Sequence, residues 1–160
     1  MTGQQQRPYR LDQDEGDEWW FLFHRMTVKV SGQDTGGALT LIEWTAPRGA
    51  GPPIHLHEHE DETFWVLEGQ VRAVCGDGQW EIPAGSMVFL PHGIEHGFVA
   101  LTDCRVLQLT NPAGFEGFVA DVGRRPEGPG LPPPALVDPE RLTRIAGQHG
   151  IEILGPPLSL

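Results

Sequence analysis

Glycine and proline interrupt this chain of 160 residues every few positions, and this punctuation limits its fold more than any other feature. The sequence holds 21 glycines and 15 prolines. Between Trp19 and Thr110 they separate about ten short runs that are rich in aliphatic, β-branched and aromatic residues. Short strands joined by turns at this spacing are typical of an antiparallel sandwich or barrel. The sequence therefore predicts a mostly antiparallel, all-β domain.

The clearest runs predict individual strands. Residues 19–30 indicate one long or two short strands, residues 33–37 a turn, and residues 38–46 a buried strand. Residues 62–68 predict a further strand, in which alternation places Glu62, Phe64 and Val66 on one face.

The pattern changes at Asn111, where an Asn-Pro pair predicts a helix N-cap with proline in the first turn. Apolar residues at helical spacing then predict a short amphipathic helix over 112–122. Residues 123–137 are a Pro/Gly-rich connector. Asp138-Pro139 repeats the cap signal before a second short helix, and residues 151–154 predict either an edge strand or a packed arm.

The length of 160 residues suits one domain. We expect a flexible N-terminal arm at residues 1–18, the β domain at 19–122, and the connector with a C-terminal helix and arm at 123–160.

The formal net charge of −11 gives no electrostatic help in binding nucleic acid or anionic lipid, so neither is an expected partner. The N-terminus lacks the apolar segment of a signal peptide, and no apolar run approaches the roughly 20 residues that span a bilayer. These features predict a soluble cytoplasmic protein. Cys75 and Cys104 are more often reduced core residues than a disulfide in such a setting, although a pairing stays open.

A cluster of metal-binding residue types lies in the middle of the chain. His55 and His57 are two residues apart, so on a strand their rings point to one face. A turn through residues 59–61 brings Glu62 beside them, and His96 offers a third imidazole. Three imidazoles and one carboxylate suit a first-row metal ion. Because no cysteine is near in sequence, an open site is favoured over closed structural zinc.

These residues resemble the two motifs of the cupin family. The first motif is matched by Gly49, His55, His57, Glu62 and Gly69, and the second by Gly85, Pro91, Gly93 and His96. Ala100 stands where the second motif has asparagine. The resemblance implies an antiparallel jelly-roll barrel in which His55, His57, Glu62 and His96 bind one divalent transition metal. This ligand set accepts Fe, Ni, Co, Mn, Cu or Zn, so the metal stays open.

Among single-domain cupins, the chain is similar to bacterial quercetin 2,3-dioxygenase-like proteins in the segments WWFLFHRMTVKVSGQDTGG, HLHEHEDETFWVLEG, and NPAGFEGFV to HGIEILGPP. That similarity implies an oxidoreductase that joins dioxygen to a flavonol or related enol or phenolic substrate. Glu62 would both touch the metal and accept the substrate proton, or would serve as a ligand alone. Burial would raise its pKa toward working pH, with the metal opposing that shift. The alternatives are a non-redox isomerase, cyclase or lyase, and a non-catalytic cupin that binds metal or a small molecule.

Other residues receive weaker assignments. Phe64, Val66 and Phe98 share faces with the expected ligands and either line a substrate pocket or form ordinary core. His59 is expected to point to solvent and His92 to lie at a rim. The resemblance also implies a homodimer. The aromatic residues 19–23 could cover a ligand or pack on a partner subunit, with the apolar face of helix 112–122 as a further contact.

Overall fold

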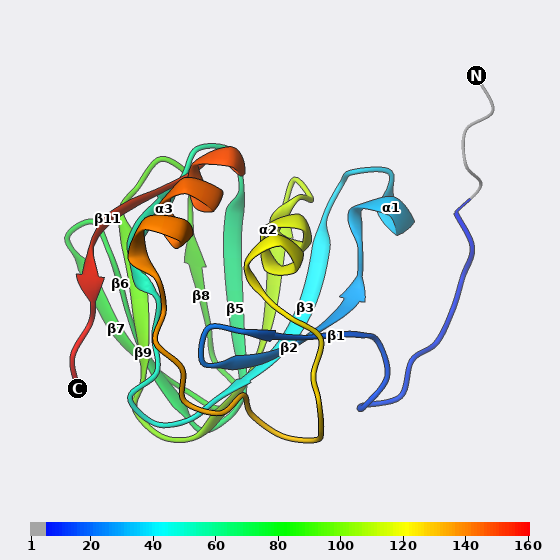
Figure 1. The fold of residues 1–160 in the computed structure, drawn as a ribbon, viewed down its shortest axis with the longest axis horizontal. Coiled ribbons are helices and arrows are strands. Elements are labelled where there is room, and N and C mark those ends of the chain that lie inside the picture. Colours follow the sequence, from blue (N-terminus) through cyan, green and yellow to red (C-terminus); the bar gives the residue numbers. More distant parts are fainter. Residues whose placement is uncertain (1–5) are drawn as a thin grey trace.

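The computed structural model describes residues 6–160 as two antiparallel sheets that pack against each other (Figure 1). The six-stranded sheet has, in spatial order, β1 (Asp17–Phe21), β2 (His24–Val30), β3 (Thr40–Ala46), β10 (Cys104–Asn111), β5 (Asp61–Glu68) and β8 (Met87–Leu90). The five-stranded sheet has β11 (Ile151–Pro157), β4 (Pro53–His57), β9 (His96–Ala100), β6 (Gln70–Cys75) and β7 (Gly78–Pro83). The helices are α1 (Gly32–Thr35), α2 (Phe115–Val122) and α3 (Pro139–Gln148).

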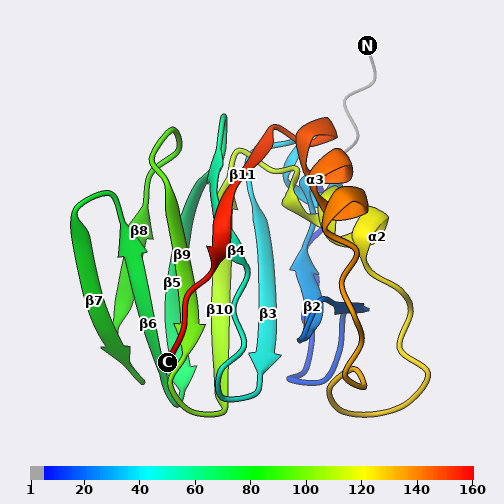
Figure 2. The same cartoon turned by 60° about the vertical axis from the view of Figure 1, so that its left-hand side comes forward.

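The predicted all-β jelly roll is confirmed, but the expected barrel is an open sandwich. Within residues 6–160 the two sheets keep separate strand orders and do not close on each other. Between them lies a core in which the rings of Trp44 and Phe98 stack with centroids 4.9 Å apart, with Phe64 edge-on to both. Figure 2 shows β7 at one side of the sandwich and the β1–β2 hairpin, α2 and α3 together at the other.

Residues 19–30 form two strands rather than one. β1 and β2 pair directly, and Phe21 opposite His24 leaves Leu22 and Phe23 as a two-residue turn. The predicted turn at 33–37 instead begins as α1. Ser31 accepts a hydrogen bond from the Asp34 N–H while the Asp34 carboxylate accepts one from the Ser31 N–H, and this reciprocal capping closes a helical turn.

The first C-terminal helix starts later than predicted. Asn111 is the last residue of β10 and pairs with Asp61 of β5, so its backbone is extended and its side chain caps nothing. Gly114 precedes the helix, which begins at Phe115. Phe115, Phe118 and Val119 are buried inside the same chain, so the apolar face of α2 is not free for a partner subunit.

The second cap prediction is correct, since the Asp138 carboxylate accepts hydrogen bonds from the backbone N–H groups of Glu140 and Arg141. Residues 151–157 form β11, the edge strand of the five-stranded sheet, where Ile153 pairs with His55. The sheet therefore continues well past residue 122, where we expected the β domain to end.

At the other terminus, residues 1–5 of the expected arm lie outside the described residues. The rest of this segment contacts β2, because the Tyr9 hydroxyl donates to the Lys29 carbonyl and the Lys29 ammonium donates to the carbonyls of Gln13 and Glu15. Cys75 and Cys104 are both free thiols. Within the described residues, no helix has the length and apolar character needed to cross a membrane.

Candidate metal centre

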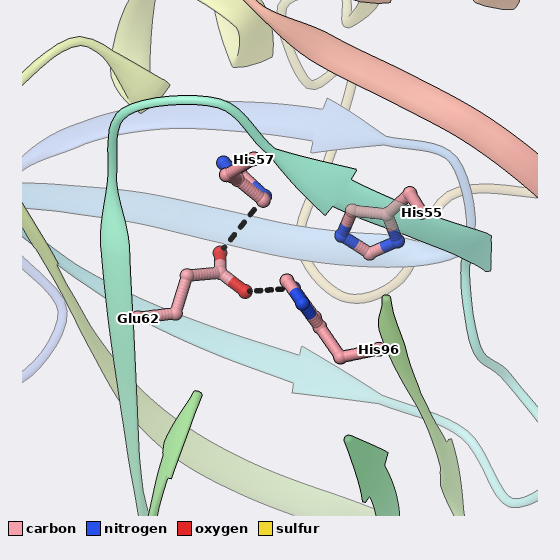
Figure 3. Close-up of side chains that lie close together, drawn as sticks. All are labelled: His55, His57, Glu62 and His96. Carbon is pink, nitrogen blue, oxygen red and sulfur yellow. Dashed lines mark hydrogen bonds and ion pairs between the residues drawn. The ribbon is translucent and has the colours of Figure 1, made fainter. Parts of the chain in front are cut away.

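Three strands bring the predicted ligands together inside the sandwich (Figure 3). His55 and His57 point the same way from β4, His96 begins β9 directly opposite His55, and Glu62 is the second residue of β5. One ligand atom from each residue lies within 4.8 Å of the others. His57, Glu62 and His96 are at most 2% exposed and His55 is 9% exposed, so the cluster is closed off from bulk water.

Two motif glycines hold these strands in place. Gly93 has φ +73° and donates its N–H to the carbonyl of His57, which ties the second motif to the first. Gly69 has φ +79°, and a Cβ there would lie 2.3 Å from the Asp103 carbonyl oxygen. Both positions need the conformational freedom of glycine, and Gly69 also needs its small size, because a Cβ at Gly93 would meet no atom within 4 Å.

Each of the three histidines has an outer partner at Nδ1. His55 Nδ1 lies 2.8 Å from the Pro53 carbonyl and His96 Nδ1 lies 2.9 Å from the Ile94 carbonyl, two residues back in each case. Carbonyl oxygens only accept, so these nitrogens carry the proton and Nε2 is left as the ligand atom. His57 Nδ1 instead lies 3.3 Å from a carboxylate oxygen of Glu60, which is itself 7% exposed.

The ligand atoms that face the centre of the cluster do not all have hydrogen-bond partners in the protein. Glu62 Oε2 is 3.1 Å from His96 Nε2, and Glu62 Oε1 accepts a hydrogen bond of 2.8 Å from the Gln108 amide. His57 Nε2 is buried, 3.6 Å from Glu62 Oε1, and has no hydrogen-bond partner among residues 6–160. A buried nitrogen without a partner is costly. The residues present therefore fit a metal ion, which would use this lone pair.

The electrostatics give His55 and Glu62 the charge states that a metal needs, whereas His57 would give up a proton when a metal binds. Burial lowers the pKa of His55 to about 4, which keeps it neutral. Burial alone would raise the pKa of Glu62, but the charge of His57 and the hydrogen bond from His96 outweigh it and lower that pKa to about 2. Burial opposes the charged form of His57, yet Glu62 and Glu60 raise its pKa. The expected upward shift at Glu62 is therefore wrong for the metal-free chain.

A small cavity of about 40 Å³ lies beside His55 and Glu62. Its other walls are hydrophobic apart from Gln108, and no Lys or Arg of residues 6–160 lines it. Phe64 and Phe98 line the cavity as predicted. Val66 does not, because it lies one pleat farther from Glu62 along β5 and is fully buried in the core.

The two remaining histidines of this region stay outside the cluster. The His59 side chain is 73% exposed, and the His92 side chain is 55% exposed with its Nδ1 2.6 Å from Asp61. Sequence reasoning missed Glu60 and Gln108. Glu60 falls within the turn predicted at residues 59–61, and the only signal for Gln108 is a polar residue at an inward position of β10.

Comparison with known proteins agrees with this architecture. A family model described as the cupin domain matches residues 42–110. The quercetin 2,3-dioxygenase of Bacillus subtilis (strain 168) is 25% identical over 91 residues, which cover 57% of this chain and 27% of that protein. The match thus spans little more than a quarter of the relative's length.

Solved structures show the same fold. An RmlC-like cupin from Shewanella frigidimarina has a TM-score of 0.60 at 17% identity, covering 71% of this chain and 99% of that one. KdgF from Halomonas sp. has a TM-score of 0.56 at 22% identity, with 62% and 91% covered. A predicted oxalate decarboxylase from Thermotoga maritima has a TM-score of 0.53 at 22% identity, with 56% and 80% covered. The two motifs, the jelly-roll fold and the family model agree that residues 42–110 of this chain form a cupin domain.

Proposed function

We propose that this protein is a metal-dependent cupin enzyme, a dioxygenase of the quercetin 2,3-dioxygenase type acting on a flavonol or a related enol or phenolic substrate. The observation that carries the proposal is the convergence of His55, His57, Glu62 and His96 on one point, with His55 and Glu62 lining a hydrophobic cavity. The similarity to the Bacillus subtilis enzyme supports the substrate class.

The Nε2 atoms of the three histidines and a carboxylate oxygen of Glu62 would hold one divalent transition metal. When bound, such an ion acts as a Lewis acid on a substrate hydroxyl, and a redox-active ion also supports chemistry with dioxygen. Zinc would supply only the first property, whereas Fe, Ni, Co, Mn and Cu have more than one accessible oxidation state.

The residues of the chain supply proton transfer and selection. Glu62 is ionised and lies at the cavity wall, where it accepts the substrate hydroxyl proton, while the amide of Gln108 fixes its Oε1. The cavity has mostly hydrophobic walls and offers no Lys or Arg side chain among the described residues. A hydrophobic enol and dioxygen suit such walls, whereas a small dicarboxylate would be buried without a counter-charge.

The proposal includes a homodimer. Trp65, Met87 and Phe89 project from the outer face of β5 and β8 and are 47–52% exposed. Trp65 pairs directly with Met87, and Phe89 lies two residues farther along β8. A second copy would cover them. Light scattering after size-exclusion chromatography tests this, since Phe89→Glu should shift a dimer toward monomer. The two free cysteines support a reducing, cytoplasmic setting.

The main test combines metal analysis of freshly purified protein with an oxygen electrode and a panel of flavonols. We expect about one metal ion per chain and oxygen uptake that matches substrate consumption. His57→Ala should lose both, whereas His59→Ala, at an exposed histidine just beyond the end of β4, should keep both. Turnover that persists without oxygen and with zinc alone would refute the dioxygenase and support the non-redox alternative. Bound metal without any turnover would support the non-catalytic alternative, a metal-binding protein.

A further inference from the structure

Two hollows of this protein share a wall. The inner cavity beside the metal ligands has a volume of about 40 Å³. An outer groove of about 370 Å³ lies between the β1–β2 hairpin and the connector, with walls that include Trp20, Arg124, Pro132, Leu136 and Arg141. Leu22 and Leu142 line both hollows. These two side chains are therefore the partition between the surface and the buried site.

The inner cavity alone cannot hold an organic substrate. Its volume suits a few water molecules or one dioxygen, since a water needs about 10–15 Å³ on this measure. Small-molecule sites usually measure about 300–1,000 Å³. The outer groove is of that size, so a substrate of the proposed class would occupy it before the partition moves.

Leu22 is held in an unusual backbone conformation. It is the one non-glycine residue with positive φ within the described chain, at +53°, and it occupies the first position of the two-residue turn between β1 and β2. Glycine is favoured at such positions, and a leucine there costs about 1–3 kcal/mol. Because glycine would suit the turn better, the turn alone does not account for a leucine. Its side chain does have a place in the partition.

The groove also has a recognisable chemistry. The Arg124 guanidinium lies over the Trp20 ring, 4.8 Å from its centroid, and pairs with Glu127. The Arg141 guanidinium donates only to backbone carbonyls of Asp121 and Val122, and makes no ion pair within residues 6–160. The Trp20 ring is only 8% exposed beneath Arg124, so the Arg141 guanidinium is the polar group that a ligand can reach. An unpaired cation beside proline and leucine side chains suits an aromatic ligand with acidic hydroxyl groups.

We propose that this groove is the entry subsite for the aromatic, hydroxylated substrate, and that Leu22 and Leu142 form the gate from it to the metal centre. The inference rests on the proposed function for its substrate class. It does not need turnover, because binding in the groove and opening of the gate both precede chemistry. Both parts are therefore measurable in metal-free protein.

The gate is tested by the rate at which diethyl pyrocarbonate modifies His55 in metal-free protein, located by peptide mass spectrometry. Leu22→Gly removes the side chain and relieves the positive φ, so it should keep the fold and speed modification of His55 about tenfold. Leu142→Ala should act in the same direction. Leu136→Ala, on the groove but not the inner cavity, is the control, with exposed His59 as the internal reference. Equal His55 rates in Leu22→Gly and wild type would overturn the gate.

The subsite is tested by titrating metal-free protein with quercetin and following quenching of tryptophan fluorescence. Arg141→Gln should raise the Kd at least about tenfold, as expected for loss of one charged hydrogen bond. Arg144→Gln, an exposed arginine on the same helix that does not line the groove, should leave the Kd unchanged. Equal Kd values for Arg141→Gln and wild type would overturn the subsite. Failure of the dioxygenase proposal would appear separately, as intact binding without oxygen uptake.

Discussion

Glu60 offers the sharpest test of how this site holds a metal. Its carboxylate lies 3.3 Å from Nδ1 of His57, and both side chains are buried. A carboxylate behind a ligating histidine fixes the ring and increases the electron donation of its other nitrogen. Removing that partner should weaken metal binding although Glu60 never touches the ion.

The magnitude depends on what replaces the carboxylate. In Glu60→Gln the amide oxygen can still accept from Nδ1–H, so orientation is kept and only the charge is lost. Because a charge-assisted hydrogen bond is about twice as strong as a neutral one, we expect roughly tenfold weaker binding, about 1.4 kcal/mol. Glu60→Ala also frees the ring, and the loss should approach a hundredfold, about 2.7 kcal/mol.

The measurement is the Kd of metal-free protein for Zn²⁺ and Co²⁺, by competition with a chromophoric chelator at fixed pH. Glu58→Gln is the matched control, because Glu58 is 57% exposed and its nearest ionic partner is the exposed His59. Equal Kd values for the Glu60 variants and the control would refute the supporting role. If His57→Ala then also bound metal normally, His57 itself would not be a ligand.

The ligand cluster was predictable because local rules fix most of it. Strand parity alone aims His55 and His57 at one point, and the spacing to Glu62 leaves room for one turn. His96 follows the motif glycines and proline at 85–93, which predict that it lies on a separate strand. In the structure, the strand register puts it directly opposite His55. These relations depend on neighbouring residues and on a short list of turn types.

The start of α2 was not predictable by the same rules. The Asn-Pro pair at 111–112 has the composition of a helix cap, but Asn111 pairs with Asp61 across the sheet. A strand partner 50 residues away in sequence decides the backbone conformation there, and local propensity yields to it. The helix then starts where Gly114 lets the chain turn away from the strand.

The closure of the site was also beyond the sequence. Phe115 and Phe118 of α2 and Leu142 of α3 line the inner cavity together with Leu22 of the β1–β2 turn. The helical spacing of the phenylalanines was visible, but spacing says only that a face is apolar and not what covers it. The sequence predicts that a partner subunit could contact this face, whereas in the structure the face lines the inner cavity of the same chain.

Three further variants separate effects that the structure predicts. Gln108→Leu removes the 2.8 Å donor to the buried Glu62 carboxylate and should cost metal-free protein about 1.5–3 kcal/mol in urea unfolding. Gly69→Ala should destabilise more than Gly85→Ala, because both have positive φ but only Gly69 meets backbone atoms within 3 Å of a new Cβ. The last variant replaces His24. Burial lowers the pKa of this histidine from 6.5 to about 4. In the unfolded chain His24 binds a proton near pH 6.5, whereas in the folded chain it binds one only near pH 4. The contribution of neutral His24 to the free energy of unfolding is therefore present above about pH 6.5 and is lost as the pH falls toward 4. The loss should approach about 3 kcal/mol. His24→Leu should lack this component, whatever its stability at neutral pH, so on acidification the unfolding free energy of wild type should fall relative to that of His24→Leu. Parallel pH profiles for wild type and His24→Leu would mean that His24 titrates normally in the fold, and that its buried position does not hold it neutral.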